Sequence, residues 1–319
     1  MSIVLDFERP LVDLRRRLTT VEKELETHPS EELQDEQRRA VADLDVAARE
    51  IYGSLSRWQK VQVARHPQRP QTLDYAKAIF TDFVEMHGDR NFGDDQAIVA
   101  GPARLDGRVV MLIGQQRGHE TRERVERNFG EPHPEGYRKA LRLFRQAEKY
   151  DMPVITLVDT PGASPGLEDE QRGQAWALAE NIMALAGLRV PVVSVIIGEG
   201  ASGGALALCV ADRLLMFEHS VLSVATPEAA AAMLWRDSKM ASHAAESLRV
   251  TAQDAYTFDI VDRIIPEPPG GAHASPVEAA ASLRRALVEE LAALDSVPVA
   301  RLLEQRYQKY RRIGPLKDA

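Results

Sequence analysis

Apolar residues in the N-terminal part of the chain recur at alternating steps of three and four positions. Two such series flank a break at Thr27–Ser30. Their members are Leu11, Leu14, Leu18, Val21 and Leu25 in the first series and Val41, Leu44, Ala48, Ile51, Leu55 and Trp58 in the second. This spacing places one apolar stripe on each of two helices, so it predicts a helical hairpin over residues 1–65. Either the core of the chain or a partner subunit must cover the stripes, and the pattern leaves both open.

Between residues 66 and 270 the pattern changes to short β-branched runs that alternate with amphipathic segments. The runs predict strands at residues 97–101, 109–113, 153–158, 191–197, 214–217 and 221–224. The amphipathic segments predict helices at residues 72–87, 136–150, 171–188, 205–208 and 227–235. Asp106-Gly107 separates the first two strands and favours a tight hairpin turn. The order of elements predicts an α/β domain in which a second short strand often precedes a helix.

Proline-containing stretches suggest where the chain divides. His66–Pro70 reads as a linker after the hairpin, and a loop at residues 267–273 precedes a helical region from Pro276 to about Lys309. The predicted organisation is therefore a hairpin at 1–65, an α/β core at 66–270 and a helical region at 271–319.

Composition narrows the classes of partner and site. The 319 residues are 44% hydrophobic and 28% charged, with a formal net charge of −8, which argues against nucleic acid as the main partner. No apolar run reaches the ~18 residues of a membrane span, and no charged leader precedes an apolar run, so we expect a cytoplasmic protein. Cys209 is the single cysteine and the eight histidines include no close pair, so no metal site is expected in this chain.

Two turns rich in small residues carry the candidate chemistry. Each follows a predicted strand, the first at Asp159–Gly166 and the second at Gly198–Ala205. Small residues leave backbone N–H groups accessible where a helix begins, and such groups bind negative charge. If that charge develops only during a reaction, the turn acts as an oxyanion hole.

Two known motifs overlap these turns, and the residues argue against both. Gly162–Gly166 matches the G-x-S-x-G nucleophile elbow around Ser164, but Pro165 lacks the N–H that this elbow uses as an oxyanion donor. Gly198–Gly203 matches the dinucleotide-binding pattern G-x-G-x-x-G, but the helix after it has room for only about two turns before Asp212. NAD binding therefore remains a minor alternative.

Several independent segments match one known family. They are the two small-residue turns, Arg127–Gly130, Pro134–Ala140, Leu5–Pro10, His87–Arg90, Pro227-Glu228 and Leu234-Trp235. On these segments the chain resembles the carboxyltransferase alpha subunit of bacterial acetyl-CoA carboxylase over nearly its whole length. Ser164 departs from the family pattern, which usually has tyrosine there, and Ala201 stands where glycine is usual. The loss of the aromatic ring at Ser164 puts a stacking contact at that turn in doubt.

The resemblance implies a crotonase-like (ClpP/crotonase) fold, a spiral of ββα units with an N-terminal helical hairpin and C-terminal helices. It implies transfer of the carboxyl group from carboxybiotin to acetyl-CoA, giving malonyl-CoA in the first committed step of fatty-acid biosynthesis. Carboxybiotin would arrive on a separate biotin carboxyl carrier protein, with none attached covalently to this chain. A beta subunit, expected to hold zinc, would complete an α2β2 heterotetramer, and biotin carboxylase would join the holoenzyme.

Such a reaction places negative charge on a ureido oxygen and on a thioester oxygen, so it needs hydrogen-bond donors rather than a nucleophile. The candidate catalytic groups are the backbone N–H groups of Gly203 and Gly204. The expected binding residues for carboxybiotin or substrate are Gly162, Ala163, Ser164, Gly200, Ala201 and Ser202. The basic residues expected to contact CoA or the carrier protein are Arg117, Arg122, Arg127, Arg138 and Lys139.

Two other function classes stay open from the sequence. A stand-alone crotonase-like hydratase or isomerase acting on an acyl-CoA would use Glu199 and Glu228 as acid–base groups. A non-catalytic scaffold would use the N-terminal hairpin to bind a partner. The set of motifs favours the carboxyltransferase subunit.

Overall fold

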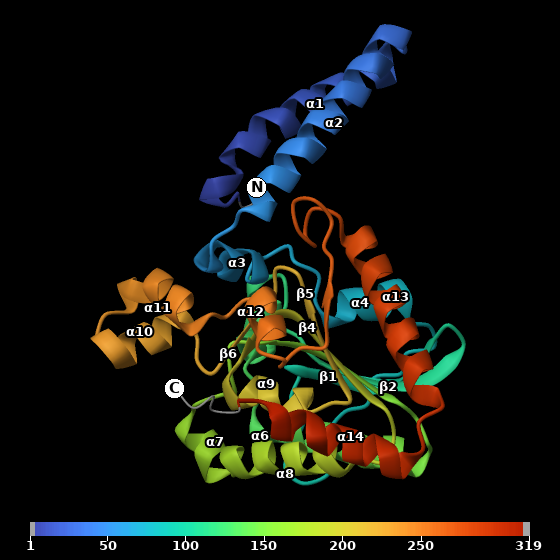
Figure 1. Cartoon of the computed structure of the whole chain (residues 1–319), viewed down its shortest axis with the longest axis vertical. Helices are drawn as coiled ribbons and strands as arrows, with labels where there is room; N and C mark the ends of the chain where they lie inside the picture. The colour runs from blue at the N-terminus through green and yellow to red at the C-terminus, as the bar shows by residue number, and fades with distance from the viewer. Residues whose placement is uncertain (1–3, 315–319) are drawn as a thin grey trace.

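One mixed β-sheet runs through the centre of the molecule (Figure 1). This computed structural model describes residues 4–314. Its strands are β1 (Ile98–Leu105), β2 (Arg108–Gln115), β3 (Val154–Thr160), β4 (Val192–Ala201), β5 (Arg213–Phe217), β6 (Val221–Ser223) and β7 (Arg263–Ile265). Their order is β1-β2-β3-β4-β5-β7, and β6 pairs with the end of β4. The β1–β2 pair is antiparallel across the predicted Asp106-Gly107 turn, and the other described pairs are parallel.

Helices cover both faces of the sheet. They are α1 (Arg9–Thr27), α2 (Glu31–Gly53), α3 (Arg57–Ala64), α4 (Thr72–Ile79), α5 (Thr121–Glu126), α6 (Pro134–Lys149), α7 (Leu167–Gln171), α8 (Gln174–Gly187), α9 (Ser202–Cys209), α10 (Pro227–Trp235), α11 (Ala241–Leu248), α12 (Ala252–Thr257), α13 (Pro276–Asp295) and α14 (Val299–Arg312), with short 3-10 turns η1 (Asp6–Glu8), η2 (Asn128–Gly130) and η3 (Ser238–Met240). Helices α6, α8, α9 and α12 pack on the face that carries Ile196, and α4 and α13 pack on the face that carries Val195. No helix in the described part of the chain is long and apolar enough to cross a membrane.

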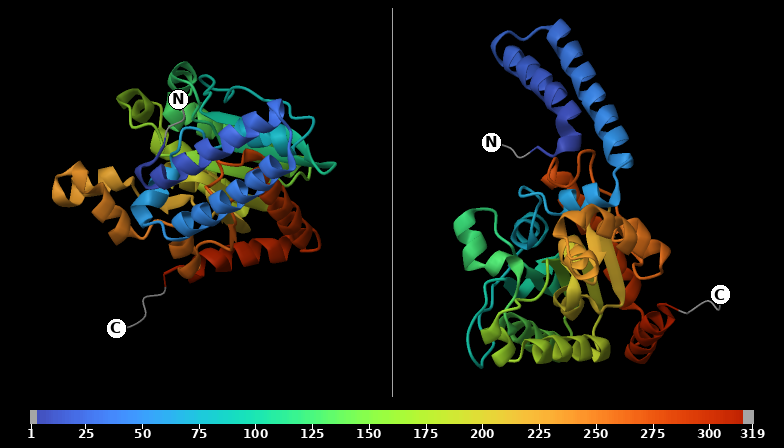
Figure 2. Two further views of the ribbon diagram at one scale, coloured as in Figure 1. Left: turned by 90° about the horizontal axis from the view of Figure 1, so that it is seen from above. Right: turned by 90° about the vertical axis from the view of Figure 1, so that its left-hand side faces the viewer.

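Helices α1 and α2 form the predicted hairpin, which projects from the body of the molecule (Figures 1 and 2). Its base packs on the chain itself, because Leu11 and Tyr52 share a buried apolar cluster with Val63. Farther along, Val21 and Ala40 are also buried. The chain's own residues therefore cover the base of the hairpin, and a partner for the rest remains a prediction.

The second predicted helix of the hairpin was expected to continue to Trp58, and this is wrong. Helix α2 ends at Gly53, and α3 begins at Arg57 after the cap residue Ser56. The Ser56 side chain accepts a hydrogen bond from the Gln59 N–H, while the Gln59 side chain accepts one from the Ser56 N–H. This reciprocal cap starts a new helix at that point.

The helix predicted over residues 72–87 is also too long. Helix α4 ends at Ile79, and the following residues extend along the edge of β1. The N–H of Val84 donates to Pro102 O at 3.0 Å, and the N–H of Met86 donates to Ala100 O at 2.8 Å. A Cβ on Gly101 would lie 1.9 Å from Val84 O, so the close approach of this segment requires glycine at that position.

The helix predicted over 171–188 corresponds to α8, which begins three residues later, at Gln174, after the cap residue Gly173 with a left-handed φ of 83°. The short helix α7 lies just before it. The C-terminal region divides into α13 and α14 at residues 296–298, where Pro298 becomes the cap residue of α14. The short elements α5, α11, α12 and β7 were not predicted, because their sequences show no clear hydrophobic periodicity.

Candidate active site

The two small-residue turns meet at the carboxyl ends of adjacent parallel strands. Strands β3 and β4 pair up to Thr160 and Gly200, and each is followed by one of the turns. A Cβ placed on Gly204 would lie 2.5 Å from Ala163 N and 2.7 Å from the carbonyl carbon of Gly162. The structure therefore brings the backbone of the second turn against the backbone of the first, and the absence of a side chain at Gly204 permits this contact.

Strand β4 passes directly into helix α9, which is longer than the predicted segment 205–208. Ser202 begins the helix with a positive φ of 62°, a strained conformation for a residue other than glycine. The N–H groups of the first helical turn lack partners within the helix, and they carry its partial positive charge. Ser202 is exposed and Gly203 is half-buried, so their N–H groups lie near the surface, whereas Gly204 is buried.

An apolar cavity of about 630 Å³ opens beside this helix terminus. Ser202 and Gly203 form part of its wall, and most of the remaining wall is apolar. Three apolar side chains at the cavity are exposed, namely Leu206 (44%), Val224 (80%) and Phe258 (42%). Exposed apolar surface of this kind marks a place where another molecule packs.

Gln115 connects the two turns, and the sequence analysis missed it. Its Oε1 accepts a hydrogen bond from the Asp159 N–H at 3.0 Å, and its Nε2 donates to Gly204 O at 2.9 Å. The side chain is fully buried. A polar residue at the end of an otherwise apolar strand was the available signal, since such a group must find buried partners.

The hydroxyl of Thr160 fixes the first turn. It lies 2.6 Å from both Gly130 O and Gly162 O, and it accepts a hydrogen bond from the Gly162 N–H at 3.0 Å. Gly162 has a φ of 151°, which favours glycine. The Arg127–Gly130 segment is thus held against the same turn.

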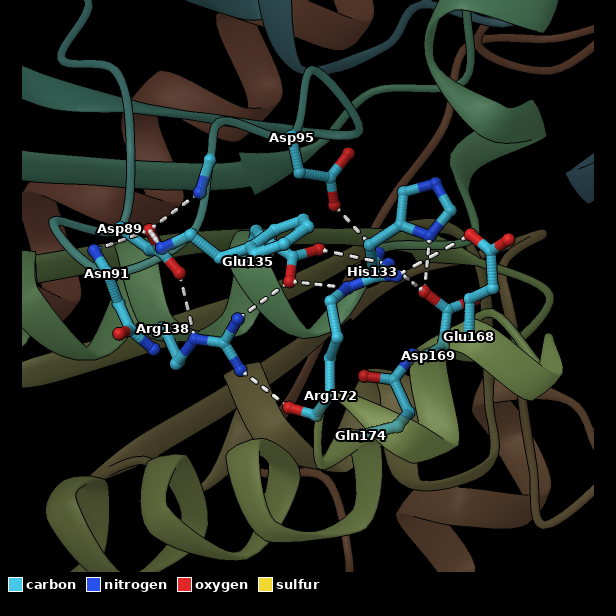
Figure 3. A network of polar contacts seen from close by, with 12 residues as sticks. Asp89, Asn91, Asp95, His133, Glu135, Arg138, Glu168, Asp169, Arg172 and Gln174 are labelled. Atoms are coloured by element: carbon cyan, nitrogen blue, oxygen red, sulfur yellow. Dashed lines mark hydrogen bonds and ion pairs between the residues drawn. The ribbon is translucent and has the colours of Figure 1, made fainter.

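Ser164 has the environment of a structural residue. Its hydroxyl donates to Asp169 Oδ2 at 2.5 Å, and the residue is 6% exposed. His133 Nδ1 lies 2.8 Å from Asp169 Oδ1, and Arg172 donates to the same oxygen at 2.7 Å (Figure 3). Burial acts to raise the pKa of Asp169, but hydrogen bonds from Ser164 and His133 hold it below its ordinary value. No histidine accepts the Ser164 proton, in agreement with the rejection of the nucleophile elbow.

Of the other expected binding residues in the second turn, only Ser202 is open to solvent. Gly200 and Ala201 are buried within β4, where a Cβ on Gly200 would lie 3.2 Å from Ile196 side-chain atoms. Ala201 is completely buried, so its expected role in ligand binding remains a prediction that the exposure of its side chain does not support.

Arg138 and Lys139 are interior residues, which corrects their assignment as CoA or carrier contacts. The Arg138 guanidinium donates to Asp89 at 2.8 Å and to Glu135 at 2.6 Å (Figure 3). The Lys139 side chain is completely buried, and its Nζ donates to Asp94 Oδ1 at 2.7 Å. These cations balance buried carboxylates around the α6 N-terminus, so they are not available to a partner.

The remaining basic residues do not form one surface. Arg122 is 90% exposed and pairs with Glu126, whereas Arg127 is 14% exposed and pairs with Glu123. Arg117 points inward, with the ion pairs described next. Their closeness in sequence could not show this, because only Arg122 lies within α5, whereas Arg117 lies in the loop after β2 and Arg127 follows the helix.

A buried charge network lies behind the ends of β3 and β4. Arg117 Nη1 lies 3.4 Å from Asp159 and 3.2 Å from Glu199, and Arg65 binds Glu199 at 2.5 Å and Glu228 at 2.6 Å. Burial acts to raise the pKa of Glu228, but the Arg65 contact holds it below its ordinary value. The two glutamates required by the hydratase alternative are therefore neutralised by arginine, which argues against that alternative.

Three possible metal ligands converge under the hairpin, although they are far apart in the sequence. Donor atoms of Glu8, His66 and His273 lie within 4.8 Å of one another. However, His66 Nδ1 accepts a hydrogen bond from the Gln68 N–H at 3.2 Å, which places the ring proton on Nε2 and opposes coordination through that atom. The cluster fits a joint between hairpin and core better than an ion site, and absence of a metal remains a prediction.

The comparisons with known proteins agree along the whole described chain. The family model described as acetyl co-enzyme A carboxylase carboxyltransferase-like matches residues 4–314. The acetyl-coenzyme A carboxylase carboxyl transferase subunit alpha of Halalkalibacterium halodurans is 51% identical over 317 residues, covering 98% of this chain and 96% of the relative. The same subunit of Geobacter metallireducens is 51% identical over 312 residues, covering 97% of each chain.

Solved structures with similar folds are more distant in sequence. A chain of a Pseudomonas malonate decarboxylase hetero-tetramer in complex with coenzyme A has a TM-score of 0.60 at 20% identity, covering 74% of this chain and 91% of that chain. A transcarboxylase 12S structure has a TM-score of 0.57 at 20% identity, covering 82% and 46%. These similarities confirm the crotonase-like α/β fold. Together with the family match, they establish that the chain belongs to the acetyl-CoA carboxylase carboxyltransferase-like family.

Proposed function

We propose that this chain is the alpha subunit of an acetyl-CoA carboxylase carboxyltransferase, which transfers a carboxyl group to acetyl-CoA and gives malonyl-CoA. The observation that carries the proposal is the contact between the N-terminal turn of α9 and the Gly162 turn. This contact supports a site in which backbone N–H groups at the edge of the sheet are the hydrogen-bond donors. The two relatives described above, which share half of its residues, are both named as the alpha subunit of acetyl-coenzyme A carboxylase carboxyl transferase.

In this proposal the N–H groups of Gly203 and Gly204 stabilise negative charge on a reacting oxygen. One well-aimed donor of this kind is worth roughly 2.7–4 kcal/mol of activation free energy. Gly162 and Ala163 form the neighbouring wall, and Ser202 lies at its open side. Gln115 and Thr160 hold these backbone groups in place before substrate binds, so little reorganisation is needed during the reaction.

The cavity beside α9 fits the apolar part of a biotin group. Its wall is largely apolar, and the partly positive helix terminus lies at one end. Ser202 and Gly203 would hold the polar ureido end there. Carboxybiotin, when bound, supplies the carboxyl group that is transferred, and we propose that it arrives on a separate carrier protein.

We further propose that a beta subunit completes the site in an α2β2 assembly, with its own zinc and the donors for the thioester oxygen. The exposed apolar residues around the cavity support a missing partner surface. A biotin carboxyl carrier protein and biotin carboxylase would act with this assembly in a cytoplasmic holoenzyme. The basic residues still available for CoA or the carrier are Arg122 and, in part, Arg117 and Arg127.

The reverse reaction tests the proposal. Carboxyl transfer from malonyl-CoA to free biocytin is measured with the chain alone, with the beta subunit alone and with both. Activity only in the mixture is the expected result. Activity of the chain alone would refute the shared site, and an inactive but stable complex would refute the proposed reaction.

A further inference from the structure

A small second cavity is walled by four arginines. The linker between α3 and α4 provides Arg65 and Arg69, the loop after β2 provides Arg117, and α5 provides Arg124. Asp159 is the single carboxylate in the wall. The volume is about 120 Å³, and at roughly 30 Å³ per water molecule this is room for one small oxyanion group.

Three of the arginines are anchored by carboxylates that do not line the cavity. Arg69 binds both oxygens of Glu267, at 2.5 and 2.9 Å, and Arg65 and Arg117 share Glu199. These ion pairs fix the guanidinium groups and leave some of their N–H groups unused. Such groups present planar arrays of donors that match phosphate oxygens.

The fourth arginine is not neutralised. Within residues 4–314 Arg124 has no ion pair, and its one hydrogen bond runs from Nε to Gly118 O at 3.2 Å. In addition, Arg65 Nε is buried without a hydrogen-bond partner. A buried donor without a partner is costly, so the cavity has unsatisfied positive groups. Burial raises the pKa of Asp159, although the Arg117 charge opposes this.

An aromatic ring stands at the exposed side of the same cavity. Phe129 lines it, is 53% exposed and has a left-handed φ of 55°. Asn128, the preceding residue, has a φ of 44°. Such conformations are strained for residues other than glycine, and they concentrate at functional sites. The strained pair holds a flat apolar ring next to a cationic cavity, an arrangement that suits a phosphate carried by an aromatic base.

We propose that the cavity lined by Arg65, Arg117, Arg124 and Phe129 is a binding site for a phosphate group. The group could belong to inorganic phosphate or to a nucleotide moiety, and for the second source the inference rests on the proposed use of a CoA substrate. The guanidinium groups would bind the oxygens, while the Phe129 ring would cover an attached base.

Isothermal titration calorimetry of the full chain at low ionic strength tests phosphate binding without enzymatic turnover. A negative result for phosphate binding can therefore be distinguished from a negative result for carboxyl transfer. The probes are inorganic phosphate, adenosine 3′,5′-bisphosphate and adenosine. We expect saturable binding of both phosphates, weakened at least tenfold by Arg124→Gln. Arg16→Gln on α1 is the control, because that side chain is 76% exposed and pairs with Asp13, and it should leave binding unchanged.

The two sources give different results. If the bisphosphate binds more tightly than inorganic phosphate, and Phe129→Leu removes the difference, the site takes a nucleotide-borne phosphate. Equal affinities, unaffected by Phe129→Leu, assign it to the free ion. Absence of saturable phosphate binding, binding of adenosine as tight as that of the bisphosphate, or equal loss in Arg124→Gln and Arg16→Gln would overturn the proposal.

Discussion

Gln115 donates a hydrogen bond from Nε2 to Gly204 O at 2.9 Å, which fastens the first turn of α9 to the end of β2. Because the same side chain accepts the Asp159 N–H, one amide sets the relative position of both turns. Gln115 is therefore a positioning residue for the proposed oxyanion donors, although it lies below the surface and cannot touch a ligand.

The first prediction concerns this amide. Gln115→Leu should lower kcat of the reconstituted enzyme by on the order of 10²-fold, since small misplacements of reacting groups cost about that much, with little change in KM. Steady-state kinetics of malonyl-CoA-to-biocytin transfer provide the measurement. Thr156→Val is the control, because the Thr156 hydroxyl donates to Leu208 O near the other end of α9. Its melting temperature should fall while kcat holds, and an equal loss of kcat in both variants would contradict the positioning role.

The second prediction separates the two glycines. A Cβ on Gly203 meets only the end of the Leu178 side chain, at 3.3 Å, whereas a Cβ on Gly204 meets the backbone of Ala163 at 2.5 Å. Gly203→Ala should therefore fold and assemble normally, and Gly204→Ala should displace the Gly162 turn and lower the melting temperature. Gly203→Val should abolish transfer while the melting curve and the complex persist. Full activity of Gly203→Val would contradict the proposed donors.

The third prediction follows from the Ser164 hydroxyl, which is bonded to Asp169 rather than to a base. Ser164→Ala should retain kcat within about twofold, and it should destabilise the fold by roughly 1 kcal/mol as one hydrogen bond is lost. Unfolding in urea and transfer kinetics measure the two effects. A serine-directed fluorophosphonate should leave the wild-type chain unlabelled. Labelling at Ser164 would contradict this prediction and show that Ser164 is a nucleophile.

The fourth prediction concerns pH. Burial acts to raise the pKa of Glu8, but the His273 ring, whose Nε2 lies 3.5 Å from Glu8 Oε1, and hydrogen bonds from the Leu5 N–H and the Tyr52 hydroxyl lower it from 4.5 to about 2. A carboxyl group with a lowered folded-state pKa stabilises the protein above its unfolded value, and this contribution is lost as pH falls through the folded value. The stability difference between wild type and Glu8→Gln should therefore be constant above about pH 5 and shrink toward pH 2.

Thermal unfolding across this pH range measures the difference for Glu8→Gln, with Glu36→Gln as the exposed control. Glu36 lies on α2 and makes a surface ion pair, so its variant should differ little from wild type at any pH. A difference for Glu8→Gln that does not change with pH would show that the Glu8 carboxylate does not secure the hairpin to the core.

Local pattern was sufficient for much of this fold. The hairpin and six of the strands follow from hydrophobic periodicity, whereas the contact between the two turns is found only in the structure. The extended segment after Ile79 was wrongly predicted as helix, because its apolar spacing fits both a helix and an extended edge segment. Only the contact with β1 decides between the two. Arg138 and Lys139 show a similar limit, since a basic pair in sequence says nothing about the carboxylates that Asp89 and Asp94 supply from another segment.

The direct passage of β4 into α9 at Ser202 has a consequence for how this enzyme can change. No loop separates the sheet from the proposed donors, so the donors are as stiff as the strand that carries them. One inserted residue at the junction would turn the helix by about 100°, given 3.6 residues per turn, and aim different N–H groups at the ligand. Variation in substrate is therefore expected to arise in the surrounding walls and in the partner subunit, while the length of this junction stays fixed.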